Sequence, residues 1–451
     1  VIPMKPFLFP CIWMVLVTVN STALFAQQGT SATSQAQAVQ RPLLSDQLNQ
    51  TLPAWLRLSG EVRGRVEGFA GGGFGDSNDA YWLNRIRLDM SLIPSGWLKL
   101  RFQAQDAQAF GRNPKPDAPP FEDTIDVRTA YAELLDPENK TMGLRIGRQE
   151  LVFGEQRLVG HVSWLNTART FDAVRATVRY KGYRLDAFAA TVVNIRDGEF
   201  NKRSDGNNFH GVYGSVSSLI PKTVIEPYAF WRLAPRLTTE LGTTGNLDFK
   251  TIGFRWVGKL PAGFDYGTEV AGQVGSLGSD QVSAWAGHWL LGYTALAFPK
   301  TPRFIVEYNY ASGDDNPGDG TRGTFDQLYP TAHDKYGLAD QVGWRNIHHG
   351  RLGVEIRPQP KLLLIGNYHS WWLASARDGL YSAAGPLVAS SADGSAGRHV
   401  GQEVDVQAVY SLSPALQLSG GYAHLFPGTF LKNATPGNAY SFPYLMISYT
   451  F

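Results

Sequence analysis

The chain ends in a stretch of alternating side chains, Tyr444-Leu445-Met446-Ile447-Ser448-Tyr449-Thr450-Phe451. In an extended strand the odd-numbered residues, all apolar or aromatic here, point to one face, and the even-numbered residues point to the other. A final strand with an apolar outer face and a terminal Phe is typical of a transmembrane barrel. Such a barrel has no free edge, because lipid cannot satisfy unpaired backbone groups. The stretch therefore predicts an all-β chain that forms a transmembrane antiparallel β-barrel.

The composition fits one large barrel better than a helical membrane protein. The 451 residues include 48 Gly, 12 Trp, 19 Tyr and 24 Phe, and the mean hydropathy is -0.19. Beyond the N-terminal segment no apolar run of about eighteen residues occurs, so no further transmembrane helix is expected. Several soluble domains would also fit the length, but a soluble β-protein core would not need polar residues on the inward face of almost every strand. The net charge of +2 says little about partners.

The N-terminal part divides by composition. Residues 1–26 are interpreted as a signal peptide, because an apolar core is followed by small residues that offer cleavage near Ala23 or Ala26. Residues 27–50 are rich in Gln, Ser, Ala and Thr, and we expect a flexible periplasmic lead-in there. Residues 51–451 then form the barrel as a single domain.

Turn signals divide the barrel region into about eighteen candidate strands of roughly ten residues, the length that spans a bilayer at a barrel tilt. Short turns are predicted at Pro94-Ser95-Gly96, Pro137-Glu138-Asn139, Lys181-Gly182, Pro221-Lys222, Pro261-Ala262-Gly263, Pro299-Lys300, Pro358-Gln359-Pro360 and Ser413-Pro414. Long polar connections alternate with them, for example 111–123, 197–208, 313–345 and 374–399. Periplasmic turns and extracellular loops show this asymmetry, which places both termini in the periplasm. The connection 313–345 is long enough that we expect it to fold over or into the pore.

Strand parity places many cations in the lumen. In the first strand Val62 and Val66 face lipid, so the charged residues beside them face inward. The same parity along the chain gives an inward set of arginines: Arg63, Arg65, Arg85, Arg87, Arg128, Arg175 and Arg351. In the early strands inward cations outnumber inward anions by about ten to four, which predicts a basic wall that favours anions. The alternative is that Arg and Glu side chains merely cross-link the barrel wall.

Two stretches resemble the alginate-export family of outer-membrane porins. The first contains Gly147-Arg148-Gln149-Glu150-Leu151, Gly154-Glu155-Gln156-Arg157-Leu158-Val159-Gly160 and Trp164-Leu165-Asn166-Thr167-Ala168-Arg169-Thr170-Phe171-Asp172-Ala173-Val174-Arg175. The second contains Ala311-Ser312-Gly313-Asp314 and Thr324-Phe325-Asp326-Gln327-Leu328-Tyr329-Pro330-Thr331-Ala332-His333. The resemblance implies an eighteen-stranded monomeric barrel with an Arg-rich constriction that passes an anionic polysaccharide outward. By motif position it places Arg148, Arg157, Arg169 and Arg175 near that constriction.

The same residues also fit other functions and ligands, but less well. A porin that takes up small organic anions fits the basic wall equally well, whereas an outer-membrane enzyme would need a grouped Ser, His and acid, and no G-x-S-x-G motif is present. With no cysteine after Cys11, thiolate sites are excluded, and no cofactor is expected. Asp314, Asp315 and Asp319 form a less favoured calcium candidate. The expected partners are outer-membrane lipid, lipopolysaccharide, the transported anion and periplasmic export proteins, with no nucleic acid.

Overall fold

The computed structural model describes residues 43–113, 118–136 and 141–451. The predicted signal peptide and most of the predicted lead-in lie outside this part of the chain. The end of the lead-in differs from the expectation of a flexible segment, because Leu44–Thr51 form helix α1. Asn49 ties this helix to the first strand, since its side-chain amide exchanges hydrogen bonds of 2.8 Å with the backbone N–H and C=O of Leu58.

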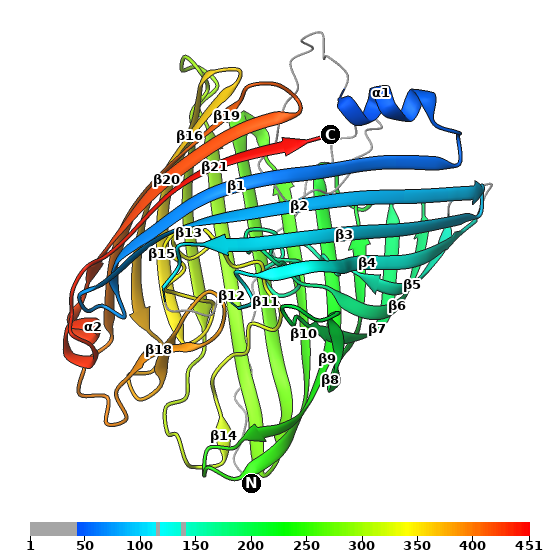
Figure 1. Cartoon of the computed structure of the whole chain (residues 1–451). Helices are drawn as coiled ribbons and strands as arrows, with labels where there is room; N and C mark the ends of the chain where they lie inside the picture. Colours follow the sequence, from blue (N-terminus) through cyan, green and yellow to red (C-terminus); the bar gives the residue numbers. More distant parts are fainter. Residues whose placement is uncertain (1–42, 114–117, 137–140) are drawn as a thin grey trace. The chain divides into compact units, whose positions relative to one another are not determined.

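Eighteen antiparallel strands form the closed barrel, as predicted (Figure 1). They are β1 Leu56–Gly72, β2 Ser77–Ser95, β3 Leu98–Phe110, β4 Asp123–Leu135, β5 Met142–Gln149, β6 Phe171–Tyr180, β7 Tyr183–Asn194, β8 Lys202–Val216, β9 Thr223–Thr238, β10 Thr244–Lys259, β11 Phe264–Leu277, β12 Asp280–Thr294, β13 Arg303–Ala311, β15 Ile347–Gln359, β16 Leu362–Leu373, β19 His399–Ser411, β20 Leu416–Pro427 and β21 Tyr440–Thr450. Each strand pairs with its neighbours in the chain, and β21 pairs with β1 from Glu61↔Thr450 onward. This last pairing closes the sheet and leaves no edge in lipid.

The side chains alternate between lipid and lumen as the period of two requires. On β21, Leu445 is 70% exposed and Ile447 is 43% exposed on the outer face, while Tyr444 is buried on the inner face. The outer face also carries exposed aromatic side chains, including Trp231 and Trp285. Other aromatic side chains of the strands, such as Tyr81, Tyr228 and Trp371, point inward and are buried. The two sets differ in facing because neighbours in a strand point to opposite sides.

The connections follow the predicted alternation with one correction. The predicted short turns join consecutive strands at one end of the barrel, except that Pro137-Glu138-Asn139 lies outside the described residues. The predicted loop 197–208 is shorter than expected, because β8 already begins at Lys202. Smaller elements are the 3-10 helix η1 Pro261–Gly263, the strands β14 Thr321–Arg322, β17 Gly379–Tyr381 and β18 Leu387–Ser390, and helix α2 Thr429–Ala434. Within the described residues, no helix has the length and apolar character needed to cross a bilayer.

Candidate functional site

Two extracellular loops fold into the lumen, and they are named here L3 (residues 150–170) and L7 (residues 312–346). L3 connects β5 to β6, and L7 connects β13 to β15. Their centres are buried: Leu151, Leu158, Phe325 and Leu338 have almost no exposed surface. The prediction that the long connection 313–345 folds into the barrel is therefore confirmed. The inward path of L3 is an additional finding.

Arginines of β1 and β2 hold one side of L3 against the barrel wall. Arg63 and Arg85 each donate a hydrogen bond of 2.8 Å to the carbonyl oxygen of Ser163. Arg65 donates to the carbonyl oxygen of Trp164 at 2.5 Å, and its guanidinium lies 3.8 Å above the centre of the Trp164 ring. These three arginines are almost completely buried. Their hydrogen bonds hold the backbone of L3 against the wall.

The positive charge of this wall is only partly neutralised. Backbone carbonyls satisfy the N–H donors of an arginine, but they do not cancel its charge. Beneath L3, five guanidiniums meet three carboxylates: Arg63, Arg65, Arg85, Arg87, Arg128, Glu61, Glu67 and Glu150. In this region the cations therefore exceed the anions by two.

Two groups of this wall show the imbalance most clearly. Arg87 donates through Nε to the neutral amide oxygen of Gln105 at 2.7 Å. Among the described residues its buried Nη2 atom has no hydrogen-bond acceptor. Glu150, at the start of L3, forms an ion pair with Arg128. Burial alone would raise the pKa of Glu150, but Arg128, His161 and Arg87 together outweigh burial and lower the pKa to about 2.

The other side of L3 is anchored to the opposite wall through ion pairs. Arg157 Nη2 lies 3.0 Å from Glu307 Oε1 on β13, and Arg351 Nη2 on β15 lies 2.5 Å from the other oxygen of the same carboxylate. Glu155 accepts a hydrogen bond of 2.8 Å from Arg255 Nη2 on β10. Although burial acts in the opposite direction, these partners raise the pKa of Arg157 and lower the pKa of Glu155. L3 therefore spans the lumen from wall to wall.

L3 approaches this far wall through a tight backbone turn. Gly154 has a φ of 53°, and a Cβ atom at this position would lie 2.9 Å from Tyr213 Oη and 3.1 Å from Arg255 Cδ. A residue other than glycine would be strained here and would push the Arg255 side chain away from Glu155.

L7 joins L3 inside the lumen through backbone hydrogen bonds. Val159 and Tyr329 form a parallel bridge, in which Gly160 N donates to Tyr329 O at 2.8 Å and Tyr329 N donates to Leu158 O at 2.8 Å. Nearby, the rings of Trp164 and His333 stack with their centres 3.7 Å apart. The two loops therefore form one connected structure across the barrel.

An apolar part of the inner wall supports the joined loops. Phe153 of L3 stacks on Tyr213 of β8 with ring centres 4.7 Å apart, and Tyr329 of L7 meets Phe209 of β8 edge-on at 5.0 Å. The surrounding wall is built from inward phenylalanines of five consecutive strands: Phe171, Phe188, Phe209, Phe230 and Phe249. Apolar side chains on the inner wall are unusual for a water-filled lumen. They explain why the loops pack on this side of the barrel.

The structure places the predicted pore arginines in three groups. Arg63, Arg65, Arg85, Arg87 and Arg128 lie together on the inner wall beneath L3, as parity predicts. Arg157 and Arg169 lie within L3 itself, where Arg169 donates to the carbonyl oxygens of Gly160 and Pro330. Burial lowers the pKa of Arg169 to about 10, because none of these partners is an acid. Arg175 and Arg351 face the lumen from other strands, and each pairs with an acid, Asp186 or Glu307.

The prediction for Arg148 is wrong. Arg148 pairs in register with Asp172 and forms an ion pair of 2.8 Å with it, and both residues share the outer face with Ile146 and Val174. Its position was inferred from the motif and not from parity. Counting alternate residues from the lipid-facing Ile146 would have placed it outside the lumen.

Several residues that hold the loops were not predicted as site residues. Glu307 of β13 holds Arg157 of L3. Glu403 of β19 accepts a hydrogen bond of 3.2 Å from Ala339 N of L7. Asp326 of L7 pairs with Arg232 of β9 at 2.6 Å. Parity gave the inward direction of the wall residues, but no local signal identifies a loop partner far away in the sequence.

The calcium candidate is also wrong. The Asp314 carboxylate accepts hydrogen bonds from the backbone of Asn316 and Gly323, and Asp319 accepts one from the backbone of Thr321. These aspartates stabilise turns of L7. In the part of the chain that the structure describes, no group of three or more His, Cys, Asp or Glu side chains is arranged to hold a metal ion.

The family model for alginate export matches residues 54–444. The chain belongs to the alginate export family. This match covers nearly the whole barrel, and together with the closed sheet it identifies an outer-membrane channel. No curated protein sequence matches this member of the alginate export family.

Solved porins of Pseudomonas aeruginosa share the fold of this alginate export family member. OpdQ aligns with a TM-score of 0.58 and 14% identity over 89% of this chain and 99% of its own. OccK2 (OpdF), solved in complex with glucuronate, aligns with a TM-score of 0.59 and 12% identity over 88% and 98%. OpdK aligns with a TM-score of 0.60 and 12% identity over 87% and 98%. At these identities the likeness concerns the fold alone.

Proposed function

We propose that this channel passes carboxylate-bearing sugars across the outer membrane, and that its main substrate is a uronate polymer such as alginate. Membership of the alginate export family supports the polymer. The observation that carries the proposal is the basic wall beneath L3, where the donors of buried arginines are satisfied mainly by neutral carbonyl and amide oxygens. The channel is passive, and it works as a pore and not as an enzyme.

The physical basis of the proposal is a positive potential at the constriction. Uncompensated charges in a low-dielectric wall focus their field into a narrow aqueous path, which lowers the barrier for anions and raises it for cations. The surplus charge lies where L3 narrows the path, so each carboxylate of a passing polymer would be attracted at the point where it loses most water. Direct contact with the guanidiniums is not required, because the field extends beyond the buried side chains.

A second candidate is the passage of single uronates or other small organic anions. It is supported by the connection between L3 and L7, which narrows the lumen from both sides. The structural similarity to OccK2, a porin solved with glucuronate, supports the same candidate. Both candidates share the anion pathway and differ in the length of the substrate.

Single-channel recording in a planar bilayer tests the proposal. We expect oligouronates added on one side to block the current in a voltage-dependent way, and neutral oligosaccharides of equal length to leave the current unchanged. Equal block by glucuronate and by oligouronates, compared per carboxylate, would favour the small-anion channel. Equal block by neutral and charged oligosaccharides would refute both candidates, because the charge of the wall would then play no part.

A further inference from the structure

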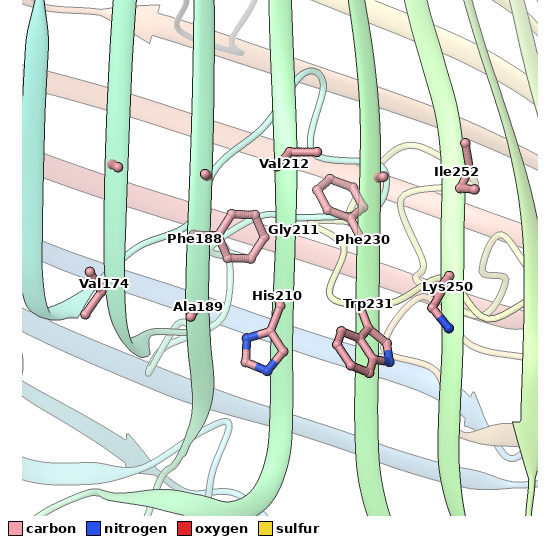
Figure 2. Close-up of a pocket in the computed structure, with 13 residues that line it drawn as sticks. Val174, Phe188, Ala189, His210, Gly211, Val212, Phe230, Trp231, Lys250 and Ile252 are labelled. Carbon is pink, nitrogen blue, oxygen red and sulfur yellow. The ribbon is translucent and has the colours of Figure 1, made fainter.

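The outer wall of the barrel carries an apolar hollow across β6 to β10. Its volume is about 610 Å³, and a second depression of about 350 Å³ continues it toward β5. Alanines, among them Ala187 and Ala229, line its floor. Val212 and Ile252, which Figure 2 labels, belong to the same lining. Ile252 is 59% exposed, so the hollow faces outward from the barrel.

The hollow arises from the order of side chains across the sheet. In the register, Ala187 of β7 lies opposite Ala176 of β6 on one side and Val212 of β8 on the other. Ala229 of β9 follows Val212, and Ile252 of β10 follows Ala229. Three of the five side chains in this row are alanines, and they leave a depression in the lipid-facing surface beside Val212 and Ile252.

The strand directions place a polar row on the extracellular side of this floor. β8 and β10 run from extracellular loops toward the periplasm, so His210 precedes Val212 and Lys250 precedes Ile252 on the extracellular side. β9 runs in the opposite direction and places Trp231 in the same row. Figure 2 shows His210, Trp231 and Lys250 side by side along this edge. Trp at this level is typical of the membrane–water interface.

The ammonium group of Lys250 lies exposed at this edge, where it forms a long ion pair with Asp248. Its side chain is 56% exposed, and its ammonium group lies 5.4 Å from the centre of the Trp231 ring. The neighbouring acid, Asp248, lies 4.0 Å from the ammonium group and accepts a hydrogen bond of 2.7 Å from Trp231 Nε1. His210 packs edge-on against the other side of Trp231 at 5.9 Å. A cation and an imidazole thus border the extracellular end of an apolar hollow.

We propose that this hollow binds lipid A, the phosphorylated acyl-chain anchor of lipopolysaccharide in the outer leaflet. One acyl chain lies over Ala187 and Ala229, and a phosphate of the headgroup contacts Lys250. This proposal rests on the position of the barrel in the outer membrane, and it does not depend on the transported substrate.

A lipid explains the shape of the surface better than a second copy of the chain. A twofold interface brings the same patch of both subunits together, so the patch must complement itself. Two concave floors that face each other would enclose a void between Val212, Ile252 and their copies. A flexible acyl chain fills a concave floor, and the headgroup then reaches the polar row at its end.

Native mass spectrometry of the detergent-solubilised full barrel with added lipid A tests the proposal. Ala229→Leu fills the floor, and Lys250→Glu removes the cation. We expect each variant to weaken the one-to-one lipid A adduct by about tenfold, the effect of losing one favourable contact of ordinary strength. Ala104→Leu, on the outer face of β3, and Lys222→Glu, in a periplasmic turn, are matched controls that should leave the adduct unchanged.

The possible outcomes separate the proposal from its alternatives. An adduct that both variants and both controls leave unchanged would overturn the site. A dimer that only Ala229→Leu abolishes would overturn it in favour of self-association. Equal binding of an uncharged diacylglycerol, with no effect of Lys250→Glu, would also overturn it, because the phosphate contact would be absent. If Ala229→Leu fails to fold, Lys250→Glu and its control Lys222→Glu still test the site, because the exposed Lys250 side chain is not needed for packing.

Discussion

Replacing Glu307 by Gln should release L3 from the far wall of the barrel. The carboxylate is fully buried and pairs with Arg157 of L3 at 3.0 Å and with Arg351 at 2.5 Å. It also accepts a hydrogen bond of 2.9 Å from Asn309 Nδ2. A neutral amide leaves two buried guanidiniums without their shared acid, and breaking a buried pair costs about 3–5 kcal/mol. At about 1.4 kcal/mol for each factor of ten, the equilibrium constant for docking of L3 should fall by roughly a hundredfold to several thousandfold.

The loss should appear in L3 and not in the barrel. Hydrogen exchange at residues 155–160 should accelerate by a similar factor, and the single-channel current should fluctuate more, while the strands keep their protection. Glu355→Gln is a matched control, because Glu355 also faces the lumen, pairs with Arg303 at 3.4 Å and is not an ion-pair or hydrogen-bond partner of L3. Unchanged exchange in L3 of Glu307→Gln, or an equal effect of Glu355→Gln, would refute the anchoring role.

Three further predictions concern the charge of the lumen and the joined loops. Arg87→Gln should lower anion permeability by roughly twofold to thirtyfold, the effect of one charge about 8 Å away at an effective dielectric constant between 80 and 20, whereas Arg148→Gln on the outer face should not shift the reversal potential. Burial would raise the pKa of Glu150, but its neighbours, Arg128 foremost, together lower the pKa from 4.5 to about 2. The contribution of Glu150 to L3 docking is therefore complete above pH 4.5 and is lost as the pH falls toward 2. Current fluctuations should therefore begin below about pH 4.5 in the wild type, and a Glu150→Gln variant should show them at every pH. A Val159→Cys and Tyr329→Cys pair should form a disulfide without altering conductance, and current that returns only on reduction would show that the loops separate in the open state.

The barrel could be predicted from the sequence because its signals are local. The period of two around Val62 and Val66 gives the facing of a strand without knowledge of its neighbours. The Pro and Gly turns give the strand ends in the same way. Helix α1 could not be predicted from the polar composition of its segment, because its docking depends on the contact of Asn49 with β1.

The site could be predicted only in part, because it depends on contacts between distant residues. Parity placed the arginines of β1 and β2 in the lumen. It could not show that carbonyl oxygens of L3 would accept their hydrogen bonds. The contact of Arg157 with Glu307 joins residues 150 positions apart. No periodicity indicates such a pair, and the loop that makes it has no regular structure of its own.

The reversal potential of the wild-type channel in a tenfold potassium chloride gradient tests the central claim most directly. The surplus of positive charge beneath L3 predicts a reversal potential of the sign and size that chloride selectivity requires. A reversal potential near zero, or one of the opposite sign, would contradict the claim that the arginine wall makes this barrel an anion pathway.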